Sequence, residues 1–278
     1  MTGPIRDIIL IRHAMNTALQ ADGTGQRKLL PGLRVAEGLT QHPFDILHGV
    51  RTSGLVSGKH LKSGHRHDRH VTAYYGVAPS VLKRLILRWT RTHPFASMEE
   101  TTFVDIGAGM GRAMLLASEF RFRAVAGVEL HPTLVGIARR NAAIWRASAK
   151  ALAPIKVFRG VATAFRFPAG PCVVFLFNPF NAVVMRRFLL NMRRQFASRP
   201  GQIDLLYVNN EQDAVIERNG GWQCVFQGPV ARSRADAIAD YRILANQPDG
   251  EYASANHEDC SIWRWIGTPF HRSERNKG

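Results

Sequence analysis

Short, mostly apolar runs alternate with longer amphipathic segments through the middle of the chain, and this alternation constrains the fold more than any other feature. Strands of this kind, separated by helices, are typical of a parallel sheet covered on both faces. The expected strands are 102–106, 124–130, 155–159, 172–177 and 203–208, and the expected helices are 110–120, 132–152 and 182–197. We therefore expect a doubly wound α/β sheet.

The two ends of the chain depart from this rhythm. Residues 1–70 are rich in Gly, His and basic residues and lack apolar periodicity, which indicates an irregular basic N-terminal extension. A helix is expected from Pro79 onward. Beyond Gly221 the pattern favours strands at 222–226, 241–245 and 261–266, hence an antiparallel edge. The expected organisation is an extension over 1–70, one domain over 71–267 and a polar tail over 268–278.

Three glycines at alternating positions, Gly107, Gly109 and Gly111, follow the first expected strand. Glycine permits a tight turn and a close approach of ligand to backbone, and the next helix offers unpaired N–H groups. The dinucleotide fingerprint fails, because Arg112 stands where its third glycine would be, and no Gly-Lys-Ser/Thr follows to make a P-loop. The loop therefore predicts a small-molecule cofactor of another kind.

The second expected strand leads to an acidic residue, Glu129, 18 residues beyond Gly111. A carboxylate at that strand end can accept both hydroxyls of a ribose. Together the loop and Glu129 resemble the first two motifs of class I S-adenosylmethionine-dependent methyltransferases. The resemblance implies a mostly parallel, seven-stranded Rossmann-like sheet and S-adenosylmethionine as cofactor. The cofactor-binding residues that it implies are Asp105, Gly107, Gly109, Met110, Gly111, Glu129, Ala162 and Asn178.

The fourth expected strand is followed by Asn178-Pro179-Phe180, which resembles the family's fourth motif, beside the transferable methyl group. An Asn side-chain oxygen can orient an amine for in-line attack on a sulfonium, and an aromatic face stabilises a cation. The alternative is that Asn178-Pro179 only terminates a strand. After the third strand, Gly160-Val161-Ala162-Thr163 departs from the family pattern, which often has an adenine-binding Asp there, and this leaves adenine to backbone groups or Thr163.

The segment around Tyr74-Tyr75 resembles one that closes over the cofactor in a subgroup including non-SET protein-lysine methyltransferases and uncharacterised bacterial relatives. This implies Tyr75 and Ser80 near the methionine end, and an aromatic slot formed by Tyr74, Tyr75 or Phe180. The alternative is that both tyrosines are core residues. From the resemblance we expect Tyr75 and Asn178 to be the catalytic residues, which position the nucleophile, and we identify no general base.

The net charge is +16, from 37 basic and 21 acidic side chains, which invites a nucleic-acid partner. Residues 101–200 carry 15 basic and three acidic side chains, whereas residues 201–278 carry eight basic and 11 acidic ones. On the expected helices 132–152 and 182–197 the arginines lie away from the apolar face, and these helices should cover opposite faces of the sheet. A solvated surface is favoured, and an acidic or nucleic-acid partner is the alternative.

Other classes of protein and site are disfavoured. The N-terminal apolar run is too short for a signal peptide or membrane span, so we expect a cytoplasmic protein. A metal site is not expected, although four histidines lie close together in the chain, at His60, His65, His67 and His70.

The sequence thus predicts a methyltransferase that uses S-adenosylmethionine and acts on an amine-type acceptor, preferably a protein lysine. A nucleic-acid base is favoured by Asn178-Pro179-Phe180 and the charge, and a small metabolite is also compatible. A non-catalytic S-adenosylmethionine-binding module is the remaining alternative, because the second Pro of the fourth motif is missing and Val161 stands at a position that departs from the family.

Overall fold

The computed structural model describes residues 41–56, 61, 73–245 and 255–267. Most of the predicted extension, the polar tail 268–278 and the histidine cluster lie outside these residues. The domain boundaries drawn from the sequence therefore stay predictions.

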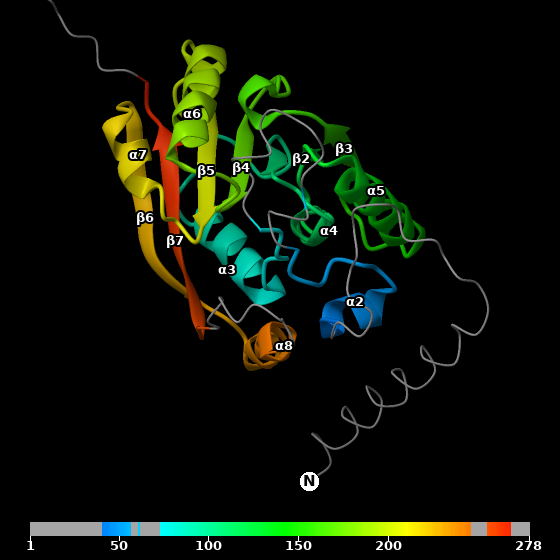
Figure 1. Ribbon diagram of the computed structural model, residues 1–278. Helices are drawn as coiled ribbons and strands as arrows, with labels where there is room; N and C mark the ends of the chain where they lie inside the picture. The colour runs from blue at the N-terminus through cyan, green and yellow to red at the C-terminus, as the bar shows by residue number, and fades with distance from the viewer. Residues whose placement is uncertain (1–40, 57–60, 62–72, 246–254, 268–278) are drawn as a thin grey trace, which may run out of the picture.

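A single seven-stranded sheet forms the centre of the described fold, in the order β3-β2-β1-β4-β5-β7-β6. Strands β1 to β5 are parallel, and β7 lies antiparallel between β5 and β6. This confirms the predicted doubly wound sheet with an antiparallel edge (Figure 1). The strands are β1 (Thr102–Ile106), β2 (Ala124–Glu129), β3 (Ile155–Arg159), β4 (Cys172–Phe177), β5 (Ile203–Val208), β6 (Trp222–Ala231) and β7 (His257–Trp265).

Helices cover both faces of this sheet. On one face α3 (Pro79–Thr90), α4 (Arg112–Ala117) and α5 (Pro132–Ala147) share an apolar cluster with the strands. On the other, α6 (Ala182–Phe196) and α7 (Asp213–Arg218) pack with a second cluster. The predicted placement of α5 and α6 on opposite faces is therefore confirmed. Their predicted inward residues are buried, while Arg139, Arg140, Arg186 and Arg187 are exposed.

The antiparallel edge differs from the sequence prediction in one element. Residues 241–245, predicted as a strand, belong to helix α8 (Arg234–Ala245). The buried residues of α8 recur at helical spacing, but two of them are aspartates, so the apolar pattern did not show a helix. Strand β6 also extends beyond residue 226, because its pairing with β7 continues past a bulge between Cys224 and Phe226.

Part of the stretch predicted as irregular is ordered. Helix α2 (Pro43–His48) begins with Pro at its first turn, and the His42 side chain accepts the Phe44 N–H, which caps it. Phe44 is buried in the cluster shared with α3 to α5. The aromatic ring of Phe44 lies 5.6 Å from that of Trp145 on α5. Residues 41–56 therefore pack on the domain, although no long apolar pattern announces them.

No helix among the described residues combines the length and the apolar character that crossing a membrane would require.

Candidate functional site

The loop between β1 and α4 has the backbone shape that its glycines allow. Gly107, Gly109 and Gly111 have φ of +76°, +54° and +94°, values that side chains with a Cβ rarely adopt. The loop also lies close to its neighbours, since a Cβ on Gly109 would sit 2.1 Å from the ring of Tyr74. On Gly107 it would sit 2.8 Å from Cβ of Pro179. Glycine at these positions is therefore required by both conformation and packing.

Glu129 at the end of β2 is fixed against this loop. One carboxylate oxygen accepts the N–H of Gly109 at 2.9 Å, and the other accepts the N–H of His131 at 2.7 Å. Burial raises the pKa of the Glu129 carboxyl, and the N–H groups of His131 and Gly109 oppose that rise. Each oxygen keeps a lone pair for a further donor. The predicted acidic partner therefore lies beside the glycine loop.

Asp105 is the second-last residue of β1 and comes just before the glycine loop. Its side chain is buried and lines a small cavity with Tyr74, Tyr75 and Gly107. Burial and then the nearby Glu129 charge raise the pKa of Asp105 to about 8. A cation that entered this cavity would favour the ionised carboxylate.

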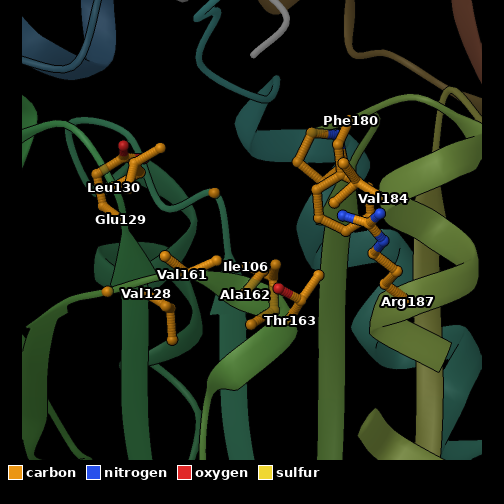
Figure 2. A pocket seen from close by; sticks show the side chains of 13 residues that line it. Ile106, Val128, Glu129, Leu130, Val161, Ala162, Thr163, Phe180, Val184 and Arg187 are labelled. Carbon is orange, nitrogen blue, oxygen red and sulfur yellow. The ribbon is translucent and has the colours of Figure 1, made fainter. Parts of the chain in front are cut away.

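A first cavity of about 100 Å³ opens between η2 (Ala162–Ala164) and α6, and we call it the η2 cavity. Figure 2 shows Phe180, Val184 and Arg187 on one side of it and Ala162 and its neighbours on the other. Its lining is mainly apolar, and Glu129 lies at its rim. The complete lining is Ile106, Gly107, Val128, Glu129, Leu130, Gly160, Val161, Ala162, Thr163, Pro179, Phe180, Val184 and Arg187.

A second, smaller cavity lies next to the first, and the two share Gly107, Glu129, Leu130 and Pro179 in their linings. Tyr74, Tyr75, His131 and Phe177 are among its other lining residues, and we call it the Tyr74 cavity. Met110, predicted to contact the cofactor, does not line these cavities. Its buried side chain belongs to a cluster with Tyr74, and its carbonyl accepts the amide of Asn141 at 2.8 Å.

Residues 41–56 are held over the glycine loop by a buried ionic network that the sequence did not predict. Arg112, the first residue of α4, donates to Thr52 Oγ1 at 2.7 Å and to Ser53 Oγ at 3.0 Å. Asp45 accepts the N–H of Ser53 at 2.7 Å and pairs with Arg112 at 3.9 Å. The hydroxyl of Tyr74 donates to the carbonyl of Thr52 at 2.8 Å. This network fixes the Tyr74 ring over Gly109.

The larger third cavity, of about 450 Å³, contains both predicted catalytic residues, and we call it the Asn178 cavity. Asn178 follows β4 with φ of +38°, and its side-chain oxygen accepts the hydroxyl of Tyr207 at 3.2 Å. Tyr75 lines this cavity as well as the Tyr74 cavity. The structure thus brings Tyr75 and Asn178 to one cavity, although about 100 residues separate them in the chain.

Charged residues that the sequence analysis did not select also line the Asn178 cavity. They are Glu211 after β5, Arg232 after β6 and Glu258 on β7. Arg232 forms an ion pair with Glu258 and lies 3.6 Å from Asp240 Oδ2. No local motif surrounds these residues, because strand pairing alone places the end of β6 beside the start of β7.

Two other predictions concern Phe180 and metal binding. Phe180 is buried, its ring lies 5.6 Å from that of Phe188, and it lines the η2 cavity. It is not among the residues that line the Asn178 cavity, so it forms no aromatic slot there.

Within the part of the chain that the structure describes, no cluster of three His, Cys, Asp or Glu could hold a metal.

The sequence matches no protein-family model and no curated protein. Solved structures with a similar chain course include the [4+2]-cyclase SpnF, with a TM-score of 0.47 and 13% identity over 67% of this chain and 82% of that one. The glycopeptide N-methyltransferase MtfA, complexed with (S)-adenosyl-L-methionine, has a TM-score of 0.44 and 13% identity, and the match covers 70% of this chain and 96% of MtfA. TrmN from Thermus thermophilus has a TM-score of 0.42 and 15% identity, and the match covers 68% of this chain and 49% of TrmN. At these identities the reaction must be inferred from the chain's own residues.

Proposed function

We propose that this protein is a class I S-adenosylmethionine-dependent methyltransferase that methylates an amine, preferably a protein lysine side chain. The observation that carries the proposal is the position of Glu129. Its carboxylate is held by the N–H groups of Gly109 and His131 and lines both the η2 and Tyr74 cavities. A carboxylate in this position can accept ribose hydroxyls, with a cavity on either side for the rest of a nucleoside cofactor.

The described residues fit S-adenosylmethionine along its length. Glu129 would bind the ribose, and the mainly apolar η2 cavity, with Ala162 and Phe180, would take the adenine. The bare backbone at Gly107 would allow close approach, and Asp105 would pair with the amino group of the methionine part. When bound, this cofactor supplies an electrophilic methyl group on a sulfonium.

The Asn178 cavity would take the acceptor. The side-chain oxygen of Asn178 and the hydroxyl of Tyr75 would orient an amine toward the methyl group, and this alignment is the main catalytic contribution. Arg232 and Glu258 are paired with each other, so Glu211 is the lining carboxylate that would favour a cationic acceptor. An ammonium side chain therefore suits this cavity better than a phosphate-bearing chain does, despite the net charge of +16.

A nucleic-acid acceptor has weaker support at the site. The Phe180 ring, which would stack on an extruded base in that interpretation, lines the η2 cavity and packs on Phe188. The basic side chains on α5 and α6 lie on opposite faces of the sheet and do not converge on the Asn178 cavity.

The cofactor assignment is tested by substituting Glu129 and measuring S-adenosylmethionine affinity by calorimetry. Glu129→Gln keeps one acceptor for the backbone N–H groups but removes the charge. We expect affinity to fall about 10-fold or more, since a hydrogen bond to a charged group contributes about 1.5–3 kcal/mol. The control is Glu217→Gln on an exposed part of α7. Unchanged affinity in a folded Glu129→Gln protein would contradict the proposal.

The acceptor is tested by incubating lysate fractions with methyl-labelled cofactor, followed by separate protease and nuclease digestion. Label released by protease and recovered as methyl-lysine supports the proposal, whereas label only in nucleic acid contradicts the acceptor class. Asn178→Ala separates an enzyme from a binding module. Because Asn178 lines the acceptor cavity and neither the η2 nor the Tyr74 cavity, contrary to its predicted cofactor contact, an enzyme should lose methyl transfer while its cofactor affinity stays within about threefold.

A further inference from the structure

Tyr75 lies where the proposed cofactor and acceptor parts of the site meet, since it lines both the Tyr74 and Asn178 cavities. Its hydroxyl donates to Asp240 Oδ1 on α8 at 2.6 Å. The hydrogen of Tyr75 is therefore committed to Asp240, and the lone pairs of its oxygen remain for a donor in the cavity.

Asp240 itself is closed to the acceptor. Its side chain is fully buried, and its second carboxylate oxygen lies 3.6 Å from Nε of Arg232. Among the described residues that line the Asn178 cavity, Tyr75 and Arg232 contact Asp240, and of these two Tyr75 is the one that can pass on a proton, because a guanidinium is not deprotonated in proteins. The charged or titratable groups that face Asp240 come from the segment before α3, from the residue after β6, from α4 and from α8, and they are Tyr75, Arg232, Arg112 and Asp236.

On the proposed function, we infer that Asp240 is the base for the acceptor amine and receives the proton through the Tyr75 hydroxyl. An alkylammonium has no lone pair and must lose a proton before it can attack. In this step an N–H proton passes to the Tyr75 oxygen as the Tyr75 proton passes to Asp240, leaving a free amine, a neutral phenol and a carboxylic acid. The free amine would then be the nucleophile for the methyl group that the cofactor supplies: its lone pair would form the N–C bond, and the electron pair of the C–S bond would remain on sulfur.

The local charges suit this relay. Burial raises the pKa of the Asp240 carboxyl, which makes it a better proton acceptor than an exposed carboxylate, while Arg232 and the Tyr75 hydrogen bond oppose that rise. Burial and the charge of Asp240 raise the pKa of Tyr75, so that its hydroxyl stays neutral. After methyl transfer, the proton on Asp240 returns to solvent by the same route once the product leaves.

Asp236 provides a matched control, one turn away on α8. It also joins α8 to the segment that carries Tyr75, because it accepts the N–H of Ser80 at 2.8 Å, whereas the Tyr75 hydroxyl donates to Asp240. Asp236→Asn therefore reports on loss of a carboxylate that anchors α8, and Asp240→Asn reports on loss of the proposed base.

A first test needs neither cofactor nor acceptor. The chain has five tyrosines, so labelling them with ¹³C at Cζ gives a simple spectrum in which Tyr75→Phe assigns the Tyr75 signal. We expect this signal to shift as Asp240 titrates, in the wild type and in Asp236→Asn, and to lose that inflection in Asp240→Asn. A Tyr75 signal that titrates identically in Asp240→Asn, or does not move in the wild type, would overturn the inference.

A second test follows methyl transfer from S-adenosylmethionine to Nα-acetyl-lysine methylamide against pH. In the wild type and Asp236→Asn, kcat should fall as pH drops through the Asp240 pKa. Asp240→Asn and Tyr75→Phe should each lower kcat about 100-fold or more, with KM changed by less than about threefold. In these two variants kcat should rise about tenfold per pH unit, because only the small fraction of bound acceptor that is already a free amine can react.

The outcomes separate this inference from the proposed function. Equal kcat and pH profiles in Asp240→Asn and Asp236→Asn, with an active wild type, would overturn the relay and leave the methyltransferase intact. Should Asp240→Asn fail to fold, the pH profile of Tyr75→Phe decides, because loss of orientation alone would lower kcat without making it rise about tenfold per pH unit. A wild type that does not bind S-adenosylmethionine would overturn the proposed function, and the relay with it.

Discussion

The cofactor half and the acceptor half of this site are built in different ways. In the cofactor half, the proposed ribose and methionine contacts come from neighbouring strands β1 and β2 and the loop between β1 and α4, within residues 105–131, whereas residues 160–187 complete the η2 cavity proposed for adenine. The acceptor half joins Tyr75, Asn178, Arg232 and Glu258, which come from four separate parts of the chain. The ribose contact can thus be encoded by one turn and one strand end, whereas the acceptor pocket depends on the complete fold.

The two halves also differ in their charge. Asp105 and Glu129 are buried carboxyl groups whose pKa values are raised by burial. A cation that binds in the cofactor half would therefore favour the ionised form of these groups. In the acceptor half Glu211 is exposed, and Glu258 is paired with Arg232. Substitutions in the cofactor half should therefore have larger effects than substitutions at the rim of the acceptor half.

The largest effect is expected from Arg112→Met, which breaks the network that holds residues 41–56 over the cofactor half. Arg112 and Asp45 are both buried, and removal of one partner from a buried pair costs about 3–5 kcal/mol. Denaturant unfolding should show this loss, while Arg146→Met on the exposed face of α5 should change stability by less than about 0.5 kcal/mol. Equal stability of the two variants would show that the network does not hold the segment.

Gly109→Ala should damage the glycine loop with less effect on the whole fold. The added Cβ would lie 2.1 Å from the Tyr74 ring, at a φ of +54°, and such strain costs about 1–3 kcal/mol. We expect weaker S-adenosylmethionine binding by calorimetry. Tyr74→Ala should recover part of the loss, because it removes the clash. No recovery would indicate that the backbone angle alone accounts for the effect.

The charge state of Asp105 should appear in the pH dependence of cofactor binding. With a pKa of about 8, the free carboxyl is largely protonated at pH 7 and must lose that proton to pair with an ammonium. Affinity should fall by up to about tenfold per unit as pH drops below 8, with proton release in buffers of different ionisation enthalpy. Asp105→Asn should remove that release, and an unaltered release would contradict the assignment.

The smallest effect is expected from Glu211→Gln at the rim of the acceptor half. Because Glu211 is exposed, its attraction for a cationic acceptor is screened, and KM for an amine should rise only about two- to fivefold. Cofactor affinity should stay unchanged, which separates the halves. Addition of salt should reduce the difference between variant and wild type. A large change in cofactor affinity would show that the two halves are coupled.

The sequence predicted the parallel strands closely, because the central strands β1, β4 and β5 are buried and mostly apolar, whereas the more exposed edge strand β3 was indicated by its place in the alternation of short runs and helical segments. The strands Thr102–Ile106, Ile155–Arg159, Cys172–Phe177 and Ile203–Val208 have the predicted bounds. Helix α8 was predicted as a strand at 241–245, because three apolar residues after Arg242 fit either element. Helix α2 has only six residues and was not predicted at all. Short or polar elements depend on what they pack against.

The sequence alone determined the sheet class, the glycine loop and the acidic end of β2, because each depends on neighbouring residues and on strand periodicity. Only the tertiary structure brought Tyr75 to Asp240, 165 residues away, and Glu258 to Arg232. These contacts follow from the insertion of β7 between β5 and β6 and from the packing of α8 beside the segment before α3. Their side chains have no local pattern, because long-range burial selects their partners.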